Sequence, residues 1–440
     1  MSRVSIRRRD EIIDALRRGT VPHAGLDTLA VGLDQFVGAF DAELDTAAGG
    51  RGVFKAVRGE YGSGKTFLAR WLAERAKQRG FATAEVQISE TETPLHRLET
   101  VYRRLVERLA TASEPAGALR SIIDAWYYAL EEDVLATGTV TEHDTASLAI
   151  ATQELAERRL GDITRSAPAF AAVLRAYRRA AVAGDHATAE GLLAWLGGQP
   201  NVAATIKRAA GIKGDLDHFG ALSSLQGLLA VLRDAGHPGL LIVLDEVETL
   251  QRVRSDVRDK GLNALRQFID EIDAGRFPGL FVLVTGTPAF FEGPQGVQRL
   301  APLAARLATD FTTDARFDNP RAIQIRLPGF DLDALIQMGQ GVRGLYLEGS
   351  LAARRIRDRC DDPYLGKLAR AITGELGGRV GVTPRLFLKK LVGDILDRID
   401  QFPDFDPNRD YRLTVIDTEL TDVERNARAA VSVDEIELDV

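Results

Sequence analysis

Cysteine is almost absent from this chain of 440 residues, because Cys360 is its only one. A single cysteine excludes an internal disulfide and any zinc site built from cysteine ligands. The six histidines are scattered without the spacing of metal ligands. We therefore expect a protein of a reducing compartment, with the cytoplasm as its default location.

Long apolar runs are absent as well. A membrane-spanning helix needs about 18 consecutive apolar residues, and the sequence contains no such stretch. The N-terminus, MSRVSIRRRDEII, is charged where a signal peptide carries its apolar segment. The sequence therefore predicts a protein with no membrane partner.

An excess of positive charge is the third absence. The chain has 56 Lys and Arg against 63 Asp and Glu, so its formal net charge is −7. A surface that is basic overall is excluded, and contact with DNA has to be local or created by assembly. Apolar residues make up 45% of the chain and charged residues 27%, which is the ordinary composition of a globular protein.

The most informative motif that is present is a phosphate loop, G-x-x-x-x-G-K-[ST], at residues 59–66. An apolar run typical of a β-strand, residues 53–57, precedes it, and a helical pattern follows. Glycines let consecutive N–H groups surround a phosphate at a helix N-terminus. Lys65 then reaches the β- and γ-phosphates, and the Thr66 hydroxyl ligates Mg²⁺. The predicted nucleotide-binding residues are Gly59, Glu60, Tyr61, Gly62, Ser63, Gly64, Lys65, Thr66 and Phe67.

A second motif, GLLIVLDEVETL, supplies two acids. Residues 240–244 form a continuous apolar run, typical of a buried strand in a parallel sheet, and end in Asp245 and Glu246. Adjacent buried carboxylates are costly without a partner. We predict that Asp245 shares Mg²⁺ with Thr66, and that Glu246 polarises the water that attacks the γ-phosphate. The two motifs together indicate ATP and Mg²⁺ as cofactors and disfavour a chance glycine-rich turn. Glu246 also favours hydrolysis over transfer of the phosphate to another substrate.

Polar residues follow the next predicted strand, residues 280–284. A hydroxyl beside the two acids is placed to orient the lytic water, with Thr287 as the first candidate and Thr285 as the second. An arginine that reaches a neighbouring subunit's γ-phosphate raises turnover by about 10³ to 10⁵. The candidates for this arginine are Arg299, Arg306 and Arg316.

Two other segments are candidates for contacts with the nucleotide. Val21, Pro22 and Gly32 precede the phosphate loop and are candidates for an adenine pocket, although a structural connector explains them almost as well. Farther along, Thr383 is a predicted N-cap, and Arg385 stands in the first turn of the helix that follows. A cation there opposes the helix dipole unless an anion lies nearby. We infer that Arg385 faces the nucleotide phosphates.

The order of elements predicts an α/β fold with a parallel sheet core. Strands are expected at residues 53–57, 82–88, 240–244, 280–284 and 322–327, with a further possible strand at residues 411–416. The predicted divisions are an N-terminal segment at 1–50, an ATPase core at 51–93 and 236–330, a helical insertion at 94–235, a helical lid at 331–400 and a tail at 401–440. Within the insertion, a helix break is expected near Gly161, and Trp126, Tyr127, Tyr128 and Trp195 are expected in the core.

Three basic stretches are candidates for contact with phosphate groups, and a solvated surface is the competing interpretation of each. They are Arg7, Arg8, Arg9, Arg17 and Arg18 near the N-terminus, Arg175, Arg178 and Arg179 in the insertion, and Arg252, Arg254, Arg258 and Lys260 after the acidic motif.

These motifs resemble the AAA+ superfamily near its initiator and signal-transduction branch. More narrowly, the chain resembles the ATP-binding proteins of BREX phage-defence systems, of the BrxC/BrxD type and closest to BrxD. The resemblance is carried by EIIDALRRGTVPHAGLDTLAVGL, the extended phosphate-loop block, LLIVLDEVETL, VTGTPAFFEG and TPRLFLKKLV. Leu33 departs from the pattern, because this branch commonly has an arginine there.

The resemblance implies an AAA+-like P-loop ATPase with a large helical insertion and a C-terminal helical lid. It also implies a role in defence against bacteriophage, with other defence-system proteins such as a helicase or a methyltransferase as partners. We expect a homo-oligomer that couples its nucleotide state to assembly on DNA or on these partners. A nucleotide-gated scaffold with little turnover is the main alternative, and a small-molecule kinase is a third.

Overall fold

A computed structural model of the chain describes residues 5–375, 384–420 and 424–425. Its centre is a five-stranded sheet in the order β2-β3-β4-β1-β5, in which all neighbouring strands are parallel. The predicted α/β class with a parallel sheet is confirmed. The strands are β1 (Val53–Arg58), β2 (Ala82–Gln87), β3 (Leu240–Asp245), β4 (Leu280–Gly286) and β5 (Gln324–Arg326).

Helices cover both faces of this sheet. Alternate strand residues point to opposite faces. Leu241, Val243 and Phe281 pack with α2 (Asp34–Ala48) and α3 (Lys65–Gln78). Their neighbours along the strands pack on the other face, against α4 (Leu98–Glu107), α10 (His218–Asp234) and α11 (Ser255–Asp273). Every residue of β3 and β4 is therefore buried, as their continuous apolar runs predict.

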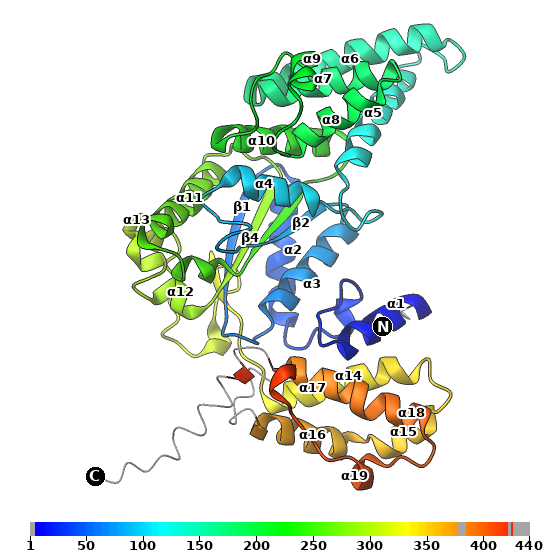
Figure 1. Ribbon diagram of the computed structural model, residues 1–440, viewed down its shortest axis with the longest axis vertical. Coiled ribbons are helices and arrows are strands. Elements are labelled where there is room, and N and C mark those ends of the chain that lie inside the picture. The colour runs from blue at the N-terminus through cyan, green and yellow to red at the C-terminus, as the bar shows by residue number, and fades with distance from the viewer. Residues whose placement is uncertain (1–4, 376–383, 421–423, 426–440) are drawn as a thin grey trace.

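The helical insertion between β2 and β3 projects from the sheet toward the top of Figure 1. Trp126, Tyr127 and Trp195 are buried in it as predicted, but the prediction for Tyr128 was wrong, since its side chain is 63% exposed. The predicted break at Gly161 was also wrong, because α6 continues through it to the residues before Pro168. The helices between α4 and α10 are α5 (Leu119–Ala136), α6 (Thr145–Ser166), α7 (Pro168–Val182), α8 (His186–Leu196) and α9 (Ala204–Ala209).

Two short helices follow β4. Helix α13 begins only one residue before Pro302, because a proline has no N–H to donate inside a longer helix. A single 3₁₀ turn at residues 297–299 precedes it. These helices are α12 (Pro288–Glu292) and α13 (Ala301–Arg306).

A C-terminal helical domain lies at the opposite end of the molecule from the insertion (Figure 1). The possible strand at residues 411–416 was a wrong prediction, because that segment is extended but pairs with no described strand. Its alternating apolar residues, Tyr411, Leu413 and Val415, pack on helices instead. The domain contains α14 (Leu332–Leu347), α15 (Ala353–Arg359), α16 (Asp362–Glu375), α17 (Pro384–Lys390), a π-helical stretch (Leu391–Leu396), α18 (Asp397–Gln401) and α19 (Pro407–Asp410). The predicted N-cap Thr383 lies outside the described residues.

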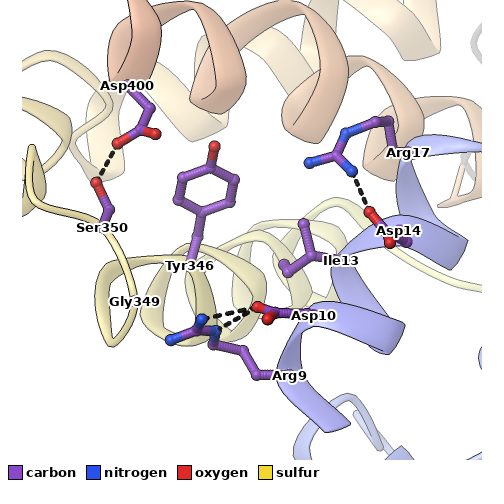
Figure 2. A pocket seen from close by; sticks show the side chains of 9 residues that line it. All are labelled: Arg9, Asp10, Ile13, Asp14, Arg17, Tyr346, Gly349, Ser350 and Asp400. Atoms are coloured by element: carbon purple, nitrogen blue, oxygen red, sulfur yellow. Dashed lines mark hydrogen bonds and ion pairs between the residues drawn. The ribbon is translucent and has the colours of Figure 1, made fainter. Parts of the chain in front are cut away.

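Helix α1 (Ile6–Arg17) packs on this domain rather than on the sheet. Ile12, Ile13 and Leu16 are buried in the core of the domain. Arg17 donates to both oxygens of Asp397, at 2.6 and 2.9 Å. Figure 2 shows the polar pocket between α1 and α14, where Arg9 pairs with Asp10 and Arg17 with Asp14. These two arginines of the N-terminal basic stretch are therefore engaged within the protein.

Of the helices that the structure describes, none is long and apolar enough to cross a membrane.

Lys55 of β1 provides a test of how the sheet is held. Its side chain is 1% exposed, donates to the carbonyls of Pro320 and Ala322 at 3.0 and 2.8 Å, and pairs with Glu43. Replacing Lys55 with Ala leaves Glu43 without its cation, which we expect to cost about 3 kcal/mol of unfolding free energy and to lower Tm clearly. The exposed Arg51, two residues before the strand, is the control, and its replacement with Ala should leave Tm unchanged. Equal Tm values for the two variants would contradict this role of Lys55.

Candidate functional site

A cavity of about 540 Å³ lies between the carboxyl end of the sheet and the C-terminal helical domain. Four parts of the chain line it: the end of α1 with residues 19–29, the loop and helix after β1, the turn after β3, and residues of the C-terminal helical domain that include the start of α17. The described residues at its polar end are Tyr61, Gly62, Gly64, Lys65, Thr66, Asp245, Glu246, Glu248, Thr249, Arg252, Arg385 and Glu424.

The loop after β1 needs its glycines. Gly62 and Gly64 have φ of +81° and +91°, in the left-handed region that glycine adopts at little cost. A Cβ on Gly59 would meet the Ser63 hydroxyl at 2.4 Å, so this position has to remain small. The loop then runs directly into α3, whose first residue is Lys65. The geometry is a strand, a tight loop and a helix N-terminus facing the cavity.

Lys65 supplies a buried cation at this end of the cavity. Its side chain is 8% exposed, and its ammonium donates to the carbonyls of Gly59 and Glu60 at 2.9 and 3.2 Å. Burial lowers the pKa of the ammonium, and the negative charges of Glu248, Asp245 and Glu246 oppose that shift. Loop carbonyls are weak partners for a buried charge, so an anionic ligand can take over this cation.

The Asp245 carboxylate connects three groups of the site by hydrogen bonds. The Thr66 hydroxyl donates to its Oδ2 at 2.9 Å, the Thr285 hydroxyl donates to its Oδ1, and the Glu246 N–H reaches Oδ1 at 3.1 Å. The structure thus brings together both predicted Mg²⁺ ligands and one of the two predicted threonines. Within the described residues, no group of three or more His, Cys, Asp or Glu forms a metal cage. A cation here fits the pattern of Mg²⁺, which is held by few protein oxygens together with phosphates and water.

Glu246 follows in a left-handed conformation, with φ of +60°. A non-glycine residue in this region costs about 1–3 kcal/mol and is typical of functional sites. Its Oε2 accepts a hydrogen bond of 2.8 Å from the Gln87 side chain. Gln87 was not predicted from the sequence. Its position at the end of β2, directly opposite Asp245 in the strand register, is the signal that identifies it.

Glu248 is a second residue that the sequence prediction missed. Its side chain is 3% exposed, it lines the cavity, and neither of its carboxylate oxygens has a hydrogen-bond partner. Burial raises the pKa of this carboxyl, while the positive charge of Lys65 opposes the shift. The segment after β3 therefore brings three acids to the cavity, where the motif predicted two.

The adenine candidates divide between two cavities. Val21 and Pro22 line the main cavity, where the described apolar residues Leu16, Leu29, Phe67, Phe330, Met338 and Leu388 surround them. Gly32 lines a smaller cavity of about 200 Å³ that shares Phe67 and Phe330 with the first. Leu33, at the position where the resembling branch has an arginine, is 5% exposed and packs into the core.

Arg385 reaches the cavity from the C-terminal helical domain, but its guanidinium already has partners. Its Nε donates to Glu424 at 3.0 Å, and its second nitrogen donates to the carbonyl of Glu419 at 2.6 Å. Glu424 is 2% exposed and also lines the cavity. Arg385 therefore lines the cavity with a carboxylate from the C-terminal segment beside its guanidinium, and its contact with nucleotide phosphates stays a prediction.

The other predicted site residues lie outside the cavity lining. Thr287 is buried and begins α12, and only Thr285 contacts Asp245. Arg299 pairs with Asp259, Arg306 pairs with Asp270 and Asp273, and the exposed Arg316 pairs with Asp314. Each of the three candidate arginines is thus paired with an acid of its own chain, and a role on a neighbouring subunit stays a prediction.

Comparison with known proteins gives one clear result. The model of the family described as BREX system ATP-binding protein BrxC/D matches residues 4–415. A search of curated proteins found no match to the chain.

Gly64 tests the geometry of the loop. An alanine there would adopt a φ of +91° and place its Cβ 3.3 Å from the Phe330 ring. The left-handed conformation costs about 1–2 kcal/mol, and we expect Gly64→Ala to weaken ATP binding about tenfold or more, measured with a fluorescent ATP analogue.

Gly344 is the matched control for this substitution. It lies in α14, where an added Cβ meets nothing within 4 Å. Gly344→Ala should leave nucleotide affinity unchanged. Wild-type affinity in Gly64→Ala would show that the loop does not contact the nucleotide.

Proposed function

Since the chain belongs to the family of BREX system ATP-binding proteins BrxC/D, we propose that it is a cytoplasmic, Mg²⁺-dependent ATPase of the AAA+ type, of the BrxD-like branch. The observation that carries the proposal is the convergence of Lys65, Thr66 and Asp245 at the carboxyl edge of a parallel sheet. Ligands of open α/β sheets bind at this edge. The cavity beside it has a polar end for phosphates and an apolar end for a base.

Phosphate binding follows from the loop after β1. Its N–H groups and the N-terminus of α3 favour an anion. Lys65 exchanges the two loop carbonyls for phosphate oxygens, which are stronger partners for an ammonium. Bound Mg²⁺ would be held by Thr66 and Asp245, and it would supply charge neutralisation at the phosphates.

Hydrolysis is assigned to Glu246, which accepts a hydrogen bond from the attacking water. The hydrogen bond from Gln87 holds its carboxylate at the end of β2, so Glu246 has to exchange this partner for the water. Thr285 orients the site through Asp245. Thr287 is retained as a candidate for water positioning in a closed state.

Closure of the C-terminal helical domain as a lid would couple turnover to assembly. Arg385 is the lid residue that faces the phosphates once it leaves Glu424. We propose that an arginine from a neighbouring subunit completes the site in a homo-oligomer. The resulting assembly would act on DNA or on other defence-system proteins, such as a helicase or a methyltransferase.

One set of contacts favours a second candidate, a nucleotide-gated scaffold with little turnover. Two side chains of the proposed cycle already have partners: Glu246 accepts a hydrogen bond from Gln87, and Arg385 donates to Glu424. A protein in this state binds ATP and changes shape without rapid hydrolysis. ATPase rates with and without duplex DNA, and the particle mass with and without an ATP analogue, distinguish the two candidates.

Replacing Glu246 with Gln tests the enzymatic proposal. The variant keeps the size and polarity of the side chain but cannot act as an anionic acceptor, so we expect ATP binding to persist and turnover to be abolished. Phosphate release and binding of a fluorescent ATP analogue are the measurements. The exposed Glu154 of α6 is the control, and its Gln variant should hydrolyse ATP at the wild-type rate. Unchanged steady-state hydrolysis in Glu246→Gln would refute the assignment.

Glu424→Gln tests the role of Arg385. The substitution removes the negative charge that competes with phosphate for the guanidinium, and we expect ATP to bind about threefold to tenfold more tightly. Glu348, exposed at the end of α14 in the same domain, is the control for the change in net charge. If both Gln variants bind ATP equally well, Arg385 does not reach the nucleotide.

A further inference from the structure

Glu248 lies beside the proposed catalytic residues. It lies in a 3₁₀ turn, Val247–Gln251, which directly follows Glu246. Hydrogen bonds from Arg258 hold the end of this turn: its guanidinium donates to the carbonyls of Leu250, Gln251 and Val253 at 3.1, 2.9 and 2.9 Å. The Glu248 side chain extends from this turn into the lining of the cavity.

The carboxylate of Glu248 is buried without a donor. It is 3% exposed, and neither oxygen accepts a hydrogen bond within the protein. A buried polar group without a partner is destabilising, and more so when it is charged. Folded proteins retain few such groups, and each calls for an explanation such as an ion, a water molecule or a catalytic role.

A structural ion pair with Lys65 does not provide that explanation. The positive charge of Lys65 acts on the Glu248 carboxyl, but the hydrogen bonds of Lys65 go to the carbonyls of Gly59 and Glu60. Once phosphate draws the ammonium away from the loop, Glu248 is left facing the polar end of the cavity together with Asp245 and Glu246. Carboxylates beside phosphates repel each other unless a donor or a cation lies between them.

We propose that Glu248 is a third acid of the hydrolytic site, whose carboxylate accepts a hydrogen bond from a water molecule in the ATP-loaded cavity. This inference rests on the proposed function. Two waters have the required chemistry: the one that attacks the γ-phosphate, and one bound to Mg²⁺. Both present an O–H donor, and either would satisfy the free carboxylate oxygens. Glu248 then positions water for the reaction that Glu246 promotes.

The test compares Glu248→Gln with Glu248→Asp in the full chain. Glu248→Gln keeps the shape but loses the anionic acceptor, so we expect kcat for ATP hydrolysis to fall about tenfold or more while KM changes less than about threefold. Glu248→Asp keeps the charge and displaces it by one methylene, so it should recover part of the lost kcat. Both variants are first checked for folding by Tm and by binding of a fluorescent ATP analogue.

Titration of Mg²⁺ separates the two waters. If the water belongs to the metal, Glu248→Gln needs more Mg²⁺ for half-maximal rate, and Mn²⁺ restores part of the rate. If it is the attacking water, the Mg²⁺ dependence stays as in the wild type while kcat falls. Either outcome supports a role for Glu248.

A purely structural Glu248 gives a different result. Removing an unpartnered buried charge is then neutral or raises Tm, and kcat stays within about twofold of the wild type. That result, together with loss of turnover in Glu246→Gln, would overturn this inference and leave the proposed function intact. An inactive wild-type protein would overturn both.

Discussion

The site depends on how the Asp245 carboxylate is held. One of its oxygens accepts from Thr66 at the start of α3, and the other accepts from Thr285 at the end of β4 and from the backbone of Glu246. Two segments that are distant from Asp245 in sequence are thus fixed to its side chain, which is 4% exposed. The parallel register makes this possible, because the carboxyl ends of neighbouring strands meet at one edge of the sheet.

Charge balance follows from this arrangement. Among the described residues, four carboxylates and three cationic side chains line the main cavity. A triphosphate adds further negative charge, so its binding requires both the phosphate-loop N–H groups and a divalent cation. The buried Lys65 is held by carbonyls rather than by a carboxylate, so phosphate oxygens can replace its present partners. The same acids that repel the phosphates are those that can hold the metal and orient water.

Part of this structure could be predicted from the sequence, and the reasons differ by residue. The phosphate loop and the buried strand before Asp245 have local signatures, and the structure brings Lys65, Thr66 and Asp245 together as those signatures predict. Gln87 and Glu248 lie at the site because of a strand register and the direction of a turn, and no local sequence pattern specifies either of these. The partner of Arg385 could not be predicted either, since Glu424 is 39 residues away in the chain. Residues 411–416 alternate like a strand, but their apolar face packs on helices.

The attachment of α1 to the C-terminal helical domain has a mechanical consequence. The next segment of the chain is bound to α3 instead: Arg70 donates to the carbonyl of Val21 at 2.9 Å, and Glu74 accepts from the N–H groups of Gly25 and Leu26. One of the two chain connections between the sheet and the helical domain is therefore the few residues around Gly19, whose φ is +71° and which lies against Arg385. The other is residues 327–331, between β5 and α14. A base bound between Val21 and Met338 would contact the sheet side and the helical domain at once. The angle between the sheet and the helical domain would then depend on whether a nucleotide is bound, and no separate sensor would be needed.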